Sequence, residues 1–205
     1  MKSMKKNLVA DAWRKTWHFL WHEDSILSWV VNVLLVFLII KFLLYPGLGL
    51  VTGTKFPVVA VVSSSMEHRQ PFNEWWPLHE NVYSAFGIAP QDFEDYPFSG
   101  GFNRGDIIVL TGKQPSEIDV GDVIVYSSRK PYPIIHRVVE VEPTLQKFQT
   151  KGDNNIGQIV SPELNEQNVP FSALLGKAVF RIPYLGYVKI VFVEGLNKLG
   201  IPVKG

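Results

Sequence analysis

Ser65 and His136 are the residues of this sequence best suited to nucleophilic catalysis. An unassisted serine hydroxyl is a poor nucleophile at neutral pH, so it needs a base within hydrogen-bond distance, and histidine suits that task best. Ser65 follows an apolar, β-branched run, 57–62, where a strand should end and the chain should turn. His136 lies inside a second strand-like run, 134–141. The pair therefore predicts acyl transfer through a serine ester.

Asp153 is the acidic candidate for the same site. It lies in a Gly-Asp-Asn-Asn turn, 152–155, that follows a short strand-like run, so its carboxylate could orient an imidazole. The structural alternative is that Asp153 only caps its own turn, as Asp and Asn often do. With Asp153 included, the order of the candidates along the chain is Ser, His, Asp.

Three short blocks carry a family resemblance. They are Ser-Met-Glu at 65–67, His-Arg at 136–137 and Lys-Gly-Asp-Asn-Asn at 151–155. In this order, behind an apolar N-terminal segment, they make the chain resemble the type I signal peptidases of the archaeal and endoplasmic-reticulum kind. The resemblance covers roughly residues 26 to 190.

The resemblance implies a role for each candidate. Ser65 is expected to be the nucleophile, His136 the general base, and Asp153 an acidic residue needed for activity. The amide of Ser65 is expected to form the oxyanion hole, helped by the hydroxyl of Ser63. The resemblance also implies a signal-peptidase-like β fold and no cofactor or metal. The expected substrates are signal peptides of exported preproteins, held as extended chains with small residues at the first and third positions before the cut.

The sequence departs from the family pattern in three places. His68 stands where the family usually has proline, directly after the Ser-Met-Glu block. Ile159 stands where many members carry a second aspartate, which leaves Asp153 without an obvious substitute. An aromatic insertion, 67–103, separates the nucleophile from the next Gly-Asp strand. Its rings are expected either to lie at a membrane interface or to form a small core of their own.

The run Ile26–Tyr45 is predicted to be a transmembrane helix. At ~1.5 Å per residue its 20 residues span roughly 30 Å, the thickness of the bilayer's hydrocarbon core. Pro46 and Gly47 are expected to end the helix. Five basic residues precede the run and only Lys55 occurs in the next fifteen, so the N-terminus is expected in the cytoplasm and the catalytic part outside. A cleaved secretory signal is the alternative, but its apolar core would be shorter.

With this one anchor, the chain is predicted to be a single-pass protein of the cell membrane. The predicted parts are a cytoplasmic basic amphipathic segment (1–25), the anchor (26–45), an exoplasmic β-rich catalytic domain (46–190) and a C-terminal membrane-proximal segment (191–205). For 182–203, a short strand and a surface helix are expected in preference to a second span. His18 and His22 have a zinc-compatible spacing, but no third ligand is in view.

The catalytic part is predicted to be all-β. Short apolar runs separated by Gly, Pro, Asn or Asp lie at 57–62, 107–110, 123–126, 134–141, 148–150 and 174–181. The net charge of +1 argues against nucleic acid as a partner, and the absence of cysteine excludes disulfides and thiol catalysis. The lipid bilayer is an expected partner, and additional membrane subunits remain open.

Two alternatives to a Ser-His signal peptidase remain at this point. The first is a membrane-anchored, non-enzymatic β-rich binding or assembly module in which Ser65 and His136 are incidental. The second is a self-cleaving or regulatory protease of related β fold with a Ser-Lys pair, for which Lys151 is the nearby amine. The sequence favours histidine, because no lysine stands at the position of His136.

Overall fold

The computed structural model describes residues 2–187, with side chains from residue 10 onward. The chain divides between Leu48 and Gly49 into two compact units, which are described separately. The C-terminal segment predicted for 191–205 lies outside the described residues.

The first unit is helical. Its helices α1 and α2 extend over Lys2–His22 and Ile26–Ile39. The side chain of Ser25 caps α2 by accepting a hydrogen bond from the Ser28 amide at 3.1 Å. Two polar side chains of α2 then bond back to α1: Ser28 Oγ donates to a carbonyl oxygen at 2.6 Å and Asn32 Nδ2 to another at 2.8 Å. These bonds occupy carbonyls left unpaired at the end of α1.

The apolar helix is longer than predicted, because Pro46 and Gly47 do not end it. After α2 the chain makes a π-helical turn, Ile40–Leu44, and continues as α3, Tyr45–Thr52. Pro46 is the second residue of α3, where the wider turn before it accommodates the missing backbone N–H. The continuous helix Ile26–Thr52 has 27 residues, and it is the one helix of the described chain long and apolar enough to cross a membrane.

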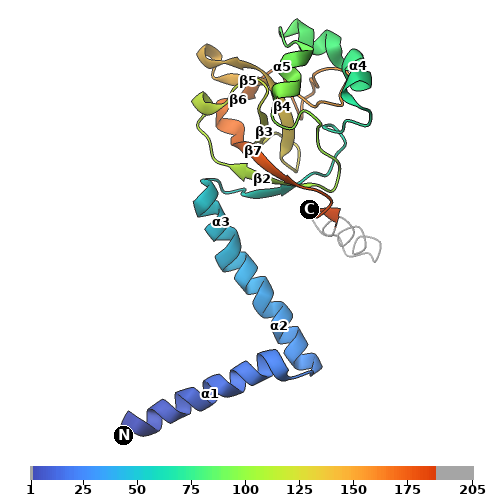
Figure 1. The fold of residues 1–205 in the computed structure, drawn as a ribbon. Helices are drawn as coiled ribbons and strands as arrows, with labels where there is room; N and C mark the ends of the chain where they lie inside the picture. Colours follow the sequence, from blue (N-terminus) through green and yellow to red (C-terminus); the bar gives the residue numbers. More distant parts are fainter. Residues whose placement is uncertain (1, 188–205) are drawn as a thin grey trace. The chain divides into compact units, whose positions relative to one another are not determined.

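The second unit is built on one antiparallel sheet, which confirms the predicted all-β fold of this part of the chain. Its seven strands are ordered β1-β2-β7-β3-β4-β5-β6, and the sheet is curled (Figure 1). The strands are β1 (Val58–Ala60), β2 (Ile107–Thr111), β3 (Val123–Tyr126), β4 (Ile134–Glu142), β5 (Lys147–Lys151), β6 (Val169–Pro170) and β7 (Leu174–Ile182).

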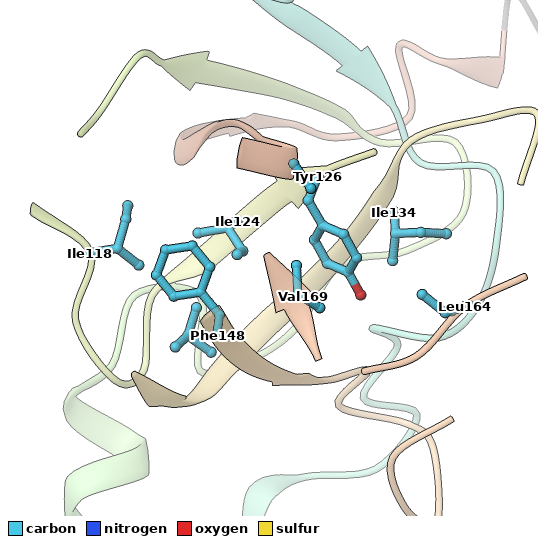
Figure 2. Packing of buried hydrophobic residues seen from close by; sticks show 9 residues of the cluster. Ile118, Ile124, Tyr126, Ile134, Phe148, Leu164 and Val169 are labelled. Atoms are coloured by element: carbon cyan, nitrogen blue, oxygen red, sulfur yellow. The ribbon is translucent and has the colours of Figure 1, made fainter. Parts of the chain in front are cut away.

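The centre of the sheet is buried on both faces. In β3, Ile124 and Tyr126 belong to one apolar cluster, while Val123 and Val125 belong to another, as the period of two requires. Figure 2 shows the first cluster, in which side chains from β3, β4, β5 and β6 lie close together on one side of the strands. This cluster fixes the register of β4, the strand that carries His136.

The aromatic insertion forms two helices that the sequence analysis did not predict. These are α4 (Phe72–Ala85) and α5 (Pro90–Asp95), which lie near each other beside β4 (Figure 1). Trp75, Tyr83 and Phe93 are completely or almost completely buried, in one cluster with Val139 of β4. Of the two uses expected for these rings, the structure therefore shows the small core. The helical signal was present, because the buried residues of α4 recur at spacings of three and four.

Candidate active site

The turn after β1 brings Ser65 to His136. Met66 is fully buried in the second apolar cluster, and the Glu67 amide closes the turn on the Ser64 carbonyl at 3.1 Å. His136 lies in the middle of β4, paired with Ile124 of β3, and is almost fully buried. The Oγ atom of Ser65 lies 3.0 Å from Nε2 of His136, which is hydrogen-bond distance. Two residues 71 positions apart in the sequence thus lie within the distance that a nucleophile and its base require.

The turn 152–155 holds Ser65 in place from the other side. The backbone amide of Asn154 donates to the Ser65 carbonyl at 2.8 Å, and Asn154 Nδ2 donates to the Ser64 carbonyl at 3.0 Å. Gly152 passes so close that a Cβ there would lie 2.8 Å from His136 Nε2 and 2.9 Å from the Ser65 carbonyl oxygen. A larger residue at Gly152 would therefore displace both Ser65 and His136.

Ser63 lies beside Ser65 on the exposed side of the turn. Its Oγ is 3.1 Å from Oγ of Ser65. A hydroxyl at this distance can reach an oxygen that develops negative charge next to the nucleophile. The placement is thus compatible with the expected oxyanion-hole role.

The other nitrogen of His136 faces Glu166, a residue that the sequence analysis missed. Glu166 is fully buried, and its Oε1 lies 2.5 Å from Nδ1 of His136. The second oxygen, Oε2, accepts a hydrogen bond from the Ile159 amide at 2.5 Å. No pattern in the sequence singles out Glu166, because it lies in a polar stretch between strands and reaches the site only through the tertiary fold.

Asp153 does not face His136 as the sequence analysis expected. Its fully buried carboxylate accepts hydrogen bonds from Arg137 at 2.7 and 3.0 Å and from the Tyr83 hydroxyl at 2.9 Å, and it lies 3.2 Å from Nε2 of His68. Burial acts to raise the pKa of Asp153, but the Arg137 charge and the hydrogen bonds from His68 and Arg137 hold it well below its usual range.

Arg137 is fully buried on the face of β4 opposite to His136. Its guanidinium makes five hydrogen bonds, two to Asp153 and three to the carbonyl oxygens of Pro97, Phe98 and Gly121 at 2.8–2.9 Å. All five N–H groups of the side chain are therefore satisfied. Burial acts to lower the pKa of Arg137, but the Asp153 carboxylate raises it overall, so the pair is ionised. Carbonyls at the end of the aromatic insertion thus help hold the ion pair.

Comparison with known proteins identifies the family. The chain is 31% identical over 171 residues to the signal peptidase complex catalytic subunit SEC11 of Komagataella phaffii, covering 78% of this chain and 81% of that protein. The SEC11 protein of Ajellomyces capsulatus is 30% identical over 187 residues, with coverages of 82% and 81%. That of Colletotrichum graminicola is 31% identical over 160 residues, with coverages of 75% and 73%. No protein-family model matches.

The chain belongs to the signal peptidase family. Its members of the archaeal and endoplasmic-reticulum kind are serine endopeptidases, so the resemblance carried by the three sequence blocks is confirmed. Membership in this enzyme family also argues against the alternative that the chain is a non-enzymatic binding module.

The placement of Lys151 bears on the Ser-Lys alternative. In this signal peptidase, Lys151 is fully buried and its Nζ donates to the carbonyl oxygens of Gly152 and Asp153, both at 3.1 Å. The amine also lies 4.6 Å from the ring centre of Tyr83. Burial lowers the pKa of Lys151 to about 8. Because its donors are directed at the turn while His136 contacts Ser65, the geometry favours the histidine.

His68 and Tyr83 are further residues that the sequence did not reveal as neighbours of the site. The His68 ring stacks on Trp75 with centroids 3.8 Å apart, and it points its Nε2 at Asp153. One signal was present for His68, because it occupies the position where the signal peptidase family usually has proline. Tyr83 had no such signal beyond the aromatic periodicity of α4.

Proposed function

We propose that this chain is a membrane-bound serine endopeptidase that removes N-terminal signal peptides from secreted and membrane preproteins. Ser65 is the nucleophile and His136 the general base. The observation that carries the proposal is the 3.0 Å contact between Ser65 Oγ and His136 Nε2, in a chain of the signal peptidase family. Because no other imidazole of the described residues contacts Ser65, His136 is the base that the geometry supports.

The reaction proceeds in two acyl-transfer steps. Ser65 Oγ attacks the carbonyl carbon before the cut while its proton passes to Nε2 of His136, and the oxyanion forms beside the Ser65 amide and the Ser63 hydroxyl. His136 then gives this proton to the leaving amine, which departs as the new N-terminus of the mature protein. Water attacks the ester, and its proton passes through His136 to Ser65 as the signal peptide leaves with a free carboxyl group.

Asp153 supports activity through structure in this proposal. Its ion pair with Arg137 fixes the turn 152–155, whose Asn154 holds the carbonyls of Ser64 and Ser65. The acid that the family resemblance calls for at Asp153 is therefore a residue that keeps the nucleophile in position.

The helix Ile26–Thr52 anchors the enzyme to the membrane in the proposed arrangement. Five basic residues precede it, which favours a cytoplasmic N-terminus and places Ser65 and His136 on the outer side, at the cell membrane. The relatives are named as catalytic subunits of a signal peptidase complex. Additional membrane subunits are therefore proposed as partners, together with the lipid bilayer and the signal peptides.

Cleavage of a preprotein by the detergent-solubilised full chain tests the function. A preprotein with an Ala-x-Ala sequence is expected to be cut once, directly after the second alanine, with the new N-terminus determined by mass spectrometry. A matched preprotein with arginine at the position before the cut should remain intact, because small residues are required there. Equal cleavage of both preproteins, or cleavage elsewhere, would contradict a signal peptidase specificity.

Replacement of Ser63 by alanine tests the oxyanion hole. Loss of one such donor is expected to lower kcat by about 10²–10³ with little change in KM, because the hydroxyl is used only when negative charge develops. Ser63→Thr keeps a hydroxyl and should retain most of the activity. Near-normal turnover of Ser63→Ala would exclude the role.

A further inference from the structure

We infer that Glu166, and not Asp153, is the positioning residue that orients the imidazole of His136, an inference that rests on the proposed Ser65-His136 mechanism. The Ser, His, Asp order along the chain predicts an aspartate in this position. The structure supplies a glutamate from a different segment, the stretch just before β6.

The contact between the two side chains is exclusive. Glu166 Oε1 and His136 Nδ1 lie 2.5 Å apart as an ion-pair contact, and no hydrogen bond from any other group of the described residues reaches either atom. Both side chains are at least 96% buried, so water does not compete for these atoms. A buried carboxylate is costly unless it is paired or hydrogen-bonded. The imidazole is thus the partner that the geometry offers to this oxygen.

The backbone holds the carboxylate in place. Oε2 accepts the Ile159 amide at 2.5 Å, and the Glu166 amide in turn donates to the Ile159 carbonyl at 2.9 Å. The Glu166 carbonyl accepts the Thr150 amide of β5 at 2.9 Å. The residue is therefore fixed through its main chain on two sides and through its side chain on a third. Such support is what a group that orients a catalytic base requires.

The contact determines which nitrogen of His136 carries the proton. An ionised carboxylate only accepts hydrogen bonds, so Nδ1 of the neutral ring must carry hydrogen and donate to Glu166. Nε2 then presents its lone pair to Ser65, whose Oγ–H donates to it across 3.0 Å. When Nε2 takes the serine proton, the Nδ1 hydrogen stays in place and the Glu166 charge stabilises the imidazolium that forms. No proton passes to Glu166.

Asp153 cannot orient His136 without losing its own contacts. Its oxygens are occupied by Arg137, Tyr83 and His68, and it pairs with the face of β4 that points away from His136. Ile159, where many family members have a second aspartate, contributes only its main chain to the site, and it contributes it to Glu166. The carboxylate missing at 159 is therefore present, but it comes from residue 166.

Glu166→Gln is the variant that tests the inference, with Glu163→Gln as the matched control on the exposed part of the same segment. The glutamine keeps the shape but presents no carboxylate, and its amide can favour the wrong ring tautomer. The expected loss in kcat is about 10²–10⁴, with KM changed little. Glu163→Gln should match the wild type.

A spectroscopic readout that does not depend on cleavage accompanies this assay. In the solubilised full chain, the Nδ1 proton of His136 should give a strongly downfield NMR resonance, assigned by its absence from His136→Ala. The resonance should persist in Ser65→Ala and Glu163→Gln and disappear in Glu166→Gln. The amide spectrum of Glu166→Gln should stay unchanged. If the loss of activity came only from disturbed folding, that spectrum would change as well.

The outcomes separate this inference from the proposed function. A downfield resonance that survives in Glu166→Gln, or a kcat of that variant within tenfold of Glu163→Gln, overturns the role of Glu166. If Glu166→Gln does not fold, the wild-type spectrum decides, because a ring without the Nδ1 hydrogen bond shows no such resonance. Cleavage by Ser65→Ala would instead defeat the proposed mechanism and leave the resonance untouched.

Discussion

Replacement of Ser65 by alanine is expected to lower turnover of a cleavable preprotein by about 10⁶-fold, the size of effect seen when a serine protease loses its nucleophile. Without Oγ no ester forms, and His136 has no proton to accept. The residual rate comes only from the binding of substrate and from the oxyanion hole.

The same substitution should leave the folded structure unaffected. Among the described residues, the Ser65 hydroxyl hydrogen-bonds only to the exposed Ser63 Oγ at 3.1 Å and to His136 Nε2 at 3.0 Å. The bond that fixes the turn uses the Ser65 carbonyl oxygen, which alanine retains. Single-turnover cleavage and thermal unfolding of the full chain measure the two effects separately.

Ser64→Ala is the matched control. Ser64 is bonded to the same turn through its carbonyl oxygen, which the substitution also preserves, so both activity and unfolding temperature should stay near wild type. Cleavage by Ser65→Ala within tenfold of Ser64→Ala would mean that another group is the nucleophile.

The residues proposed as nucleophile and base could be singled out from the sequence because both are tied to local patterns. Ser65 follows a β-branched run, and His136 lies in an alternating strand whose period fixes its face. The all-β sheet was predictable for the same reason, since turn residues separate its strands. These local patterns do not give the distance between Ser65 after β1 and His136 in β4, because that distance depends on how the sheet curls.

The orienting acid was not predictable because its position depends on long-range pairing. Glu166 and Asp153 are both acidic residues in irregular segments, and only the pairing of β5 and β6 decides which of them reaches His136. The helix end at Pro46 was mispredicted for a different reason. Proline usually ends a helix, but a π-helical turn before it removes the conflict.

Asp153→Asn is expected to lower the free energy of unfolding of the catalytic unit by about 3–5 kcal/mol, the usual cost of breaking a buried ion pair from one side. The variant leaves the Arg137 charge buried at 0% exposure without a counter-charge. Activity should fall as well, because the turn that holds Ser65 loses the ion pair between Asp153 and Arg137 that keeps it in position. Urea unfolding of the solubilised full chain, followed by tryptophan fluorescence of the aromatic insertion, measures the effect.

The effect should depend on pH with a definite sign. The pKa of Asp153 is lowered in the folded state, so its contribution to stability is complete above the unfolded pKa of about 3.9 and is lost as pH falls further. The stability difference between wild type and Asp153→Asn should therefore be constant above about pH 5 and shrink below about pH 4. A difference that does not change with pH would show that the charge of Asp153 is not what stabilises the fold.

A double-mutant cycle then distinguishes the ion pair from the packing of its members. Arg137→Met removes the guanidinium and leaves Asp153 unpaired, whereas Arg137→Met combined with Asp153→Asn leaves no buried charge. The double variant should be destabilised by less than the sum of the two single variants, because each single change strands the charge that the other removes. Strict additivity would mean that Tyr83 and His68 hold Asp153, and the insertion carbonyls hold Arg137, independently of the ion pair. The two side chains would then hold the turn 152–155 through packing and not through their charges.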